Sequence, residues 1–194
     1  TDSSIPEAFS YYDQVLDALV LVGATPSRFG AGPVTLTRYF QMARNSNEQT
    51  AMEMTKWFDT NYHYLVPEWS NDLAFTPDSA MLLAEFAEAK SLGITTRPVL
   101  IGPVTLLLLG KAVDGIDPLD LLPRLLTAYR KVLGELAAAG AEWVQIDEAA
   151  LVTDLPEGYA EAFRAAYAAF AEVPLKLMLT TYFGKLGDNL ELAC

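Results

Sequence analysis

Cysteine and histidine are almost absent from this chain. Its single cysteine, Cys194, is the last residue, and His63 is its single histidine. One cysteine excludes an intrachain disulfide, which fits a reducing compartment and leads us to expect a cytoplasmic protein. A zinc site takes several His, Cys or carboxylate ligands, and His63 has no second histidine and no nearby cysteine. We therefore expect no metal site in this chain.

Basic residues are also scarce. The chain has 13 Lys and Arg against 25 Asp and Glu, giving a net charge of −12, and the basic residues form no stripe. Nucleic-acid binding needs a local positive surface, and peripheral membrane binding uses a basic amphipathic helix. We therefore expect neither nucleic acid nor a membrane surface as a partner of this chain.

Long hydrophobic runs are missing too. The longest, VTLLLLG at 104–110, is far shorter than the ~20 residues that span a bilayer. The opening TDSSIPEAF has neither a basic start nor an apolar run, so it does not predict a signal peptide. The chain begins without Met and stops at LELAC without a closing signal, so we expect a fragment of a longer protein.

What is present is a globular composition with alternating strands and helices. Of the 194 residues, 52% are hydrophobic and 20% charged, which fits one compact domain. Strands are predicted at 95–102, 142–147 and 175–182, with a less regular one at 57–66. Helices are predicted at 11–24, from an N-cap at Thr76 to Gly93, from Asp117-Pro118 to Gly140, and at 157–171.

This alternation predicts βαβ units and a parallel sheet, hence an α/β fold. The pattern alone leaves an open doubly wound sheet and a closed barrel as alternatives. No G-x-G-x-x-G follows a strand, which disfavours dinucleotide binding. In either architecture the chemistry gathers at the carboxyl ends of the strands.

Polar side chains follow two of the predicted strands. Asp147 and Glu148 end the second, and Thr180 and Thr181 end the third. Two carboxylates at a strand end can form an acid–base pair or bind a charged substrate. Adjacent strand residues point to opposite faces, however, so a positional role is the favoured interpretation. The threonine hydroxyls more often satisfy loop backbone groups than bind a ligand.

The segment MTKWFDTNYHYLVPEW, residues 54–69, has the highest density of polar and aromatic residues. We interpret it as the wall of a binding site. Lys56 is its sharpest candidate, because a lysine in an acidic protein needs an anionic partner. That partner is either a ligand or a nearby carboxylate, and with 25 acids in the chain the internal salt bridge is a strong alternative.

Long segments of the chain resemble a known family. FSYYDQVLDALVLVGATPSRF, MTKWFDTNYHYLVPE, RPVLIGPVTLLLLGK, WVQIDEAAL and LTTYFG resemble, in this order, the amino-terminal half of cobalamin-independent methionine synthase. That family is also called 5-methyltetrahydropteroyltriglutamate–homocysteine methyltransferase. The resemblance covers nearly the whole chain and is weakest at about residues 30–50.

The resemblance implies an architecture of two facing (β/α)8 TIM barrels with the active site between them. Residues 1–194 would form part of the amino-terminal barrel, starting after the family's first strand and helix and ending before its last two strands. A whole barrel takes ~250 residues, so the barrel would be incomplete. The zinc cofactor and most of the homocysteine and pterin pocket would belong to the carboxy-terminal barrel, which this chain lacks.

The resemblance also implies roles for individual residues. Lys56 in MTKW matches a lysine that binds the polyglutamate tail of methyltetrahydrofolate, and Asn61 in DTNYHY matches an asparagine near that ligand. Asp147 and Glu148 match the family's IDEPAL, with Ala149 in place of the proline. We take this motif as architectural in the amino-terminal barrel, so we expect no catalytic residue and no metal ligand in this chain.

The resulting hypothesis is that the chain is part of a methyltransferase, which converts homocysteine to methionine with 5-methyltetrahydropteroyltri-L-glutamate as methyl donor. This segment would support folate-tail binding and be inactive alone. One alternative is a non-catalytic folate- or anion-binding module. Another is a different TIM-barrel enzyme that uses Asp147 and Glu148. An incomplete barrel exposes sheet edges, so we also expect self-association of the fragment.

Overall fold

The computed structural model describes residues 4–45 and 49–194 and has a mixed α/β fold around a parallel sheet. The sheet has four strands in the order β1-β5-β7-β8, and each neighbouring pair is parallel. The strands are β1 (Ile5–Glu7), β5 (Thr96–Ile101), β7 (Trp143–Asp147) and β8 (Lys176–Thr180). The predicted α/β class and the three main strands are therefore confirmed.

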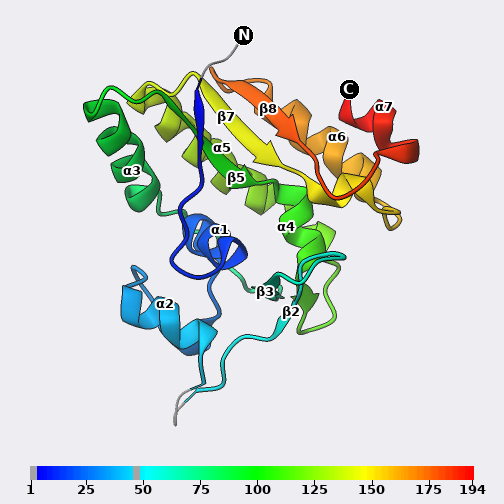
Figure 1. Cartoon of the computed structure of the whole chain (residues 1–194). Coiled ribbons are helices and arrows are strands. Elements are labelled where there is room, and N and C mark those ends of the chain that lie inside the picture. Colours follow the sequence, from blue (N-terminus) through cyan, green and yellow to red (C-terminus); the bar gives the residue numbers. More distant parts are fainter. Residues whose placement is uncertain (1–3, 46–48) are drawn as a thin grey trace.

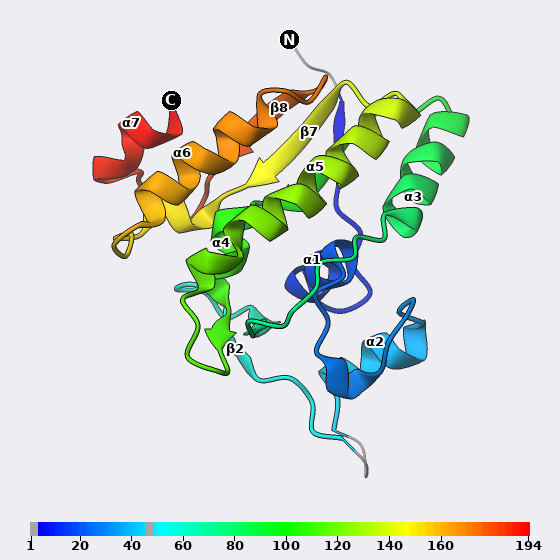
Figure 2. The same cartoon turned by 180° about the vertical axis from the view of Figure 1, so that it is seen from behind.

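Helices cover one face of this sheet. Figures 1 and 2, which view the molecule from opposite sides, show α3 (Ala80–Ser91), α5 (Leu122–Ala139) and α6 (Tyr159–Phe170) together on that face. Alternation along β7 matches this arrangement: Val144 and Ile146 are fully buried, whereas Gln145 is half-buried. The sheet thus has a packed face and a second face without a helix over it.

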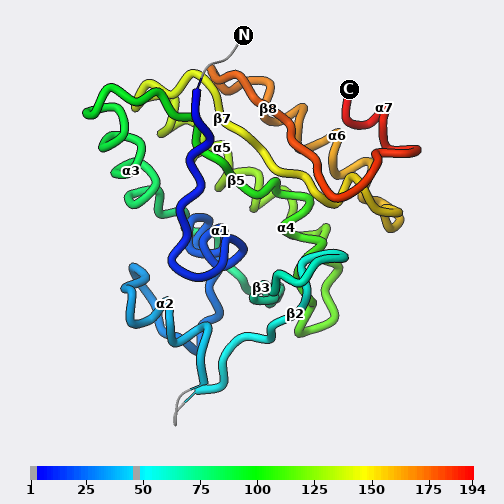
Figure 3. The backbone as a smooth tube through the Cα atoms, in the orientation of Figure 1, coloured from blue at the N-terminus to red at the C-terminus, as the bar shows by residue number. Residues whose placement is uncertain are grey.

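Most of the remaining elements lie beyond the carboxyl ends of the strands, whereas the last helix, α7 (Leu190–Ala193), lies beside α6. Figure 3 follows the chain from β1 into α1 and α2 on that side. Their bounds are α1 (Gln14–Val22), α2 (Leu36–Ala43), β2 (Met54–Lys56), β3 (His63–Leu65), β4 (Glu68–Trp69), α4 (Pro103–Leu109), β6 (Lys111–Ala112) and α7 (Leu190–Ala193). Single 3-10 turns cover Ser27–Phe29, Pro118–Leu121, Ala149–Val152 and Gly187–Asn189.

Local capping chemistry explains several helix ends. Asp13 caps α1, its carboxylate accepting from the Leu16 N–H at 3.0 Å. Asp117 caps the turn before α5 in the same way, as predicted. Gly140 ends α5 in the left-handed region at φ 93°, which a residue without Cβ adopts freely.

Two local predictions are wrong. The helix expected from Thr76 begins at Ala80, and the residue before it, Ser79, makes no side-chain capping hydrogen bond. The reason is tertiary: the Asp78 N–H donates to Leu21 O, which holds 76–78 against α1. The strand expected at 57–66 forms only as β3 at 63–65, because 57–62 is the loop that joins β3 to its antiparallel partner β2 at 54–56. The short elements β1 and α2 were not predicted at all.

Within the described residues the sheet does not close, because β1 and β8 each have one neighbour and form its two edges. The parallel sheet is confirmed, while the (β/α)8 barrel remains a prediction. No described helix combines the length and apolar character that crossing a bilayer requires.

Candidate functional site

The segment predicted as a binding wall folds into a β-hairpin. Lys56 of β2 lies directly opposite His63 of β3, and Thr55 lies opposite Tyr64. The Trp57 N–H donates to Tyr62 O at 2.7 Å and closes the loop. Because side chains alternate along a strand, Lys56 and His63 share one face of the hairpin, and the aromatic residues share the other.

The aromatic face is packed into the protein. Trp57 is 1% exposed, and its ring lies edge-on against those of Tyr62 and Tyr64, with centroids 6.3 and 5.7 Å away. The Tyr64 hydroxyl donates to Leu109 O of α4 at 2.9 Å. These contacts hold the hairpin against the body of the molecule, so its opposite face is presented on a rigid support.

Asp13 ties the same hairpin to α1. Its carboxylate is 1% exposed, accepts from the Leu65 N–H at 3.0 Å and the Tyr62 hydroxyl at 2.7 Å, and also caps α1 through Leu16. Burial raises the pKa of the Asp13 carboxyl, although these hydrogen bonds oppose the shift. One buried side chain thus joins two elements more than 45 residues apart in sequence.

The outer face of the hairpin carries the predicted folate-tail residues. Lys56, Asn61 and His63 are all exposed. Across residues 4–45 and 49–194, Lys56 forms no salt bridge within 4.0 Å, so the internal ion pair weighed as the alternative is not formed there. The Asn61 backbone oxygen lies 3.0 Å from His63 Nδ1 and orients the imidazole. The face is therefore open to an anion.

Asp147 and Glu148 point to different sides of the sheet, as alternation predicts. Asp147 accepts from Gln145 Nε2 at 2.8 Å and lines a cavity, where burial raises the pKa of its carboxyl. Glu148 is 0% exposed and accepts from the Thr105 N–H at 2.9 Å and the Tyr167 hydroxyl at 3.3 Å. This geometry separates the two carboxylates and gives Glu148 a positional role beneath α4.

Burial raises the pKa of Glu148 to about 7, because no solvent reaches the charged form. The half-buried Thr180 ends β8 and Thr181 follows it, and Thr180 O accepts from the Glu148 N–H at 3.0 Å. This backbone contact joins neighbouring strand ends, while the role of the two threonine hydroxyls stays a prediction.

The largest cavity described was not predicted from the sequence. It has a volume of about 790 Å³ and lies at the carboxyl ends of the strands, beside α1 and α3. Its lining includes nine aromatic residues: Phe9, Tyr11, Tyr12, Tyr39, Trp57, Tyr62, Tyr129, Tyr182 and Phe183. The local signals that could have indicated it are the aromatic run FSYY at 9–12 and the segment 54–69, whose Trp57, Thr60 and Tyr62 line it.

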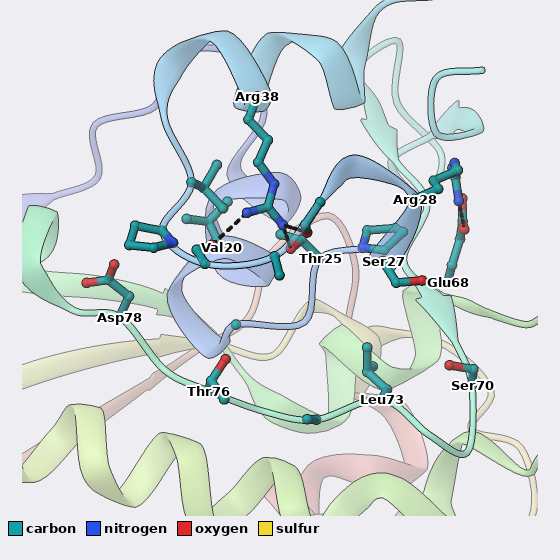
Figure 4. A pocket seen from close by; sticks show the side chains of 18 of the residues that line it. Val20, Thr25, Ser27, Arg28, Arg38, Glu68, Ser70, Leu73, Thr76 and Asp78 are labelled. Atoms are coloured by element: carbon teal, nitrogen blue, oxygen red, sulfur yellow. Dashed lines mark hydrogen bonds and ion pairs between the residues drawn. The ribbon is translucent and has the colours of Figure 1, made fainter. Parts of the chain in front are cut away.

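A second cavity of about 690 Å³ contains two arginines, but both are used by the protein itself (Figure 4). Arg28 forms a two-pronged ion pair with Glu68. Arg38 donates to Gly30 O and Gly32 O and, at 3.0 Å, to Thr25 Oγ1. These cations hold the loop before α2, so we do not assign this cavity to an anionic ligand.

Comparison with known proteins identifies the family. The family model described as "Cobalamin-independent synthase, N-terminal domain" matches residues 2–194, and the chain belongs to this family. Two similar relatives, from Rhodopseudomonas palustris (strain ATCC BAA-98 / CGA009) and Xylella fastidiosa (strain 9a5c), are 53% and 56% identical to it. Both are named 5-methyltetrahydropteroyltriglutamate–homocysteine methyltransferase.

Coverage is unequal between the chain and these relatives. The two alignments cover 95% of this chain but only 27% and 25% of the relatives. The chain therefore spans about a quarter of the length of the curated relatives that it matches. Among the residues that the structure describes, no group of three or more His, Cys, Asp or Glu is placed to hold a metal ion.

Proposed function

We propose that residues 1–194 are part of the amino-terminal (β/α)8 barrel of a cytoplasmic two-barrel methionine synthase. The complete protein would transfer a methyl group from 5-methyltetrahydropteroyltri-L-glutamate to homocysteine. Family membership over nearly the whole chain supports this proposal, as do the names of relatives that are more than 50% identical. The parallel sheet is compatible with the proposed barrel.

The role proposed for this segment is to hold the folate tail. A triglutamate tail is polyanionic, and a protein of net charge −12 repels it unless cations are placed locally. Lys56 provides such a cation on the exposed face of a rigidly anchored hairpin. Asn61, at the loop of the same hairpin, can donate its amide to a tail carboxylate. The exposed Lys56, which has no ion-pair partner among the residues that the structure describes, is the observation on which this role rests.

The residues described here do not fit zinc, so no step of the reaction is assigned to a metal on this chain. In the proposal, zinc belongs to the other barrel and supplies the chemistry that holds homocysteine as a thiolate. This segment therefore contributes binding and support for the partner barrel. The isolated chain should show no turnover with homocysteine and the methylated folate, and measurable turnover would contradict this division of labour.

Calorimetric titration with methyltetrahydrofolate carrying one or three glutamates tests tail binding. We expect the triglutamate to bind more tightly, and Lys56→Ala to weaken it about tenfold while leaving the monoglutamate nearly unchanged. Lys131→Ala, which removes the same charge from α5, is the matched control. Equal losses in both variants would show a general charge effect rather than a tail site at the hairpin.

A non-catalytic anion-binding module is the second candidate, because Lys56 is exposed on a hairpin that is anchored by contacts within this chain. The same titration with simple tricarboxylates separates the two: such a module would bind them as well as the folate. The third candidate, an acid–base enzyme using Asp147 and Glu148, finds no support in the geometry, since Glu148 is fully buried and the two carboxylates lie on different sides.

A further inference from the structure

The 790 Å³ cavity at the strand ends has a charge pattern that the folate hypothesis does not use. Five carboxylates line it: Glu7, Asp17, Asp78, Glu85 and Asp147. None of its described lining residues is Lys, Arg or His. A polyanionic tail is therefore repelled from this cavity, and the exposed face with Lys56 and His63 is separate from it.

Buried carboxylates in and beside the cavity hold two of its tyrosine rings in place. The Tyr39 hydroxyl donates to Asp17 Oδ1 at 2.6 Å, and the Tyr62 hydroxyl donates to Asp13 at 2.7 Å. Their hydroxyls are thus engaged, so the rings offer their faces and edges. A cation attracted to an aromatic face gains about 0.5–2 kcal/mol, more where water is excluded.

Two carboxylates of the cavity are incompletely compensated. Asp17 Oδ2 is a buried oxygen without a hydrogen bond, and the half-buried Glu85 makes no described hydrogen bond or salt bridge. Burial together with repulsion from Glu7 and Asp17 raises the pKa of the Glu85 carboxyl. Uncompensated negative charge in a partly dry cavity is stabilised by a bound cation.

Apolar surface is concentrated at the same place. Seven of the thirteen most exposed large hydrophobic side chains line this cavity: Phe9, Tyr11, Tyr12, Leu36, Tyr62, Met81 and Phe183. Exposed apolar surface gathered around a concave, polar-edged site is typical of a ligand site rather than of scattered surface residues. The ligand must therefore combine positive charge with an apolar body.

We propose that this cavity binds a small organic cation, an amidinium, guanidinium or alkylammonium group on a flat apolar frame. The cation lies between the carboxylates of Glu85 and Asp17, and the frame contacts the tyrosine and phenylalanine rings. This site is distinct from the folate-tail face, so it stands or falls independently of the proposed function.

Three probes of nearly the same shape and different charge test the proposal. The 194-residue chain is titrated with benzamidinium, neutral benzamide and anionic benzoate at constant ionic strength, using tryptophan fluorescence and calorimetry. We expect benzamidinium to bind best and benzoate worst, with about a tenfold difference between them. Equal affinities, preference for benzoate, or no saturable benzamidinium binding at millimolar concentration would overturn the site.

Two variants locate the charge. Glu85→Gln should weaken benzamidinium binding about fivefold and leave benzamide unchanged, whereas Glu88→Gln, an exposed change on the same helix outside the lining, should have little effect. If circular dichroism shows Glu85→Gln unfolded, Asp17→Asn provides the same comparison. Equal effects of Glu85→Gln and Glu88→Gln would refute the cavity as the binding site. A dimer of the chain that forms without ligand and prevents benzamidinium binding would also refute the cavity as the binding site.

Discussion

Glu148 shows how one side chain can control stability at the residue scale. It is fully buried, and its carboxyl accepts hydrogen bonds from α4 and α6. Burial stabilises the protonated form, so its pKa is about 7 in the folded chain against 4.5 for a free glutamate. The motif is therefore better explained by packing than by catalysis, and it makes stability depend on pH.

The expected pH dependence has a defined sign. Below pH 4.5 Glu148 is protonated in both states, and between 4.5 and 7 only the unfolded chain loses the proton. Its contribution to stability should therefore fall across this window, by roughly 3 kcal/mol if the shift is fully realised, and stay constant above it. Urea unfolding at several pH values should show this slope reduced in Glu148→Gln. Glu161→Gln, exposed and paired with Arg164, should retain it.

Asp13 supports a second prediction at this scale. Asp13→Ala removes the cap of α1 and leaves the Leu65 N–H and Tyr62 hydroxyl without their buried acceptor. We expect a loss of about 2–4 kcal/mol in the free energy of unfolding, measured by urea titration. Asp59→Ala, at an exposed position in the hairpin loop, is the control. A loss below that of the control would show that Asp13 does not anchor the hairpin.

At the scale of elements, β5, α4 and β7 meet at Gly102. A Cβ built there would lie 2.0 Å from Glu148 Cδ, although the Gly102 backbone, at φ −69°, suits any residue. The glycine is thus required by the close approach of α4 to a buried side chain and not by its dihedral angles. The sequence IGPV at 101–104 contains the glycine, but only the packed structure gives the reason for it.

Gly102→Ala should accordingly destabilise the chain by about 3 kcal/mol or more. Combining it with Glu148→Ala should recover about 1–2 kcal/mol relative to the sum of the single changes, because the second change removes the clashing carboxyl. Gly134→Ala in α5, where a new Cβ meets nothing within 4 Å, should instead stabilise by about 1 kcal/mol. Additive effects of the first pair would contradict the proposed clash.

At the scale of the whole molecule, the open sheet is the dominant feature. Its edges, β1 and β8, each have an unpaired side within the described structure, and one face has no helix over it (Figure 1). Unpaired strand edges template association with another chain. We therefore expect the predicted self-association to occur at the edge strands β1 and β8.

Sedimentation velocity over a range of concentrations tests this prediction. We expect a sedimentation coefficient that rises with concentration, and a smaller rise in Met178→Lys, which places a charge in the centre of the edge strand β8. Leu92→Lys, at a 69% exposed position outside the sheet, is the control. A concentration-independent monomer would show that the open edges are protected.

Much of the fold follows from local sequence. Leu125, Tyr129 and Leu133 repeat at helical spacing, and Gly140 ends their helix as predicted. The strands at 96–101 and 143–147 are short runs that contain β-branched residues, a pattern typical of partly buried strands. Such signals work because neighbouring residues determine helix periodicity, strand alternation and caps.

The family segments singled out Lys56 and Asn61 in advance, and the structure shows both exposed on one hairpin. Their role in binding the folate tail remains a prediction. The start of α3 was misplaced because the contact between Asp78 and Leu21 is not visible locally. The single strand expected at 57–66 likewise gave way to a hairpin, since Asp13 holds Tyr62 and Leu65 from a distant part of the chain.

By itself, the sequence determined the α/β class, the absence of a disulfide, the acidic charge and the family. Only the tertiary structure decided that Glu148 is fully buried beneath α4, that Lys56 has no described ion-pair partner, and that nine aromatic and five acidic residues line one cavity. The physical reason is distance along the chain. The cavity wall joins residues from 7 to 183, and their meeting depends on how helices and strands pack rather than on any local pattern.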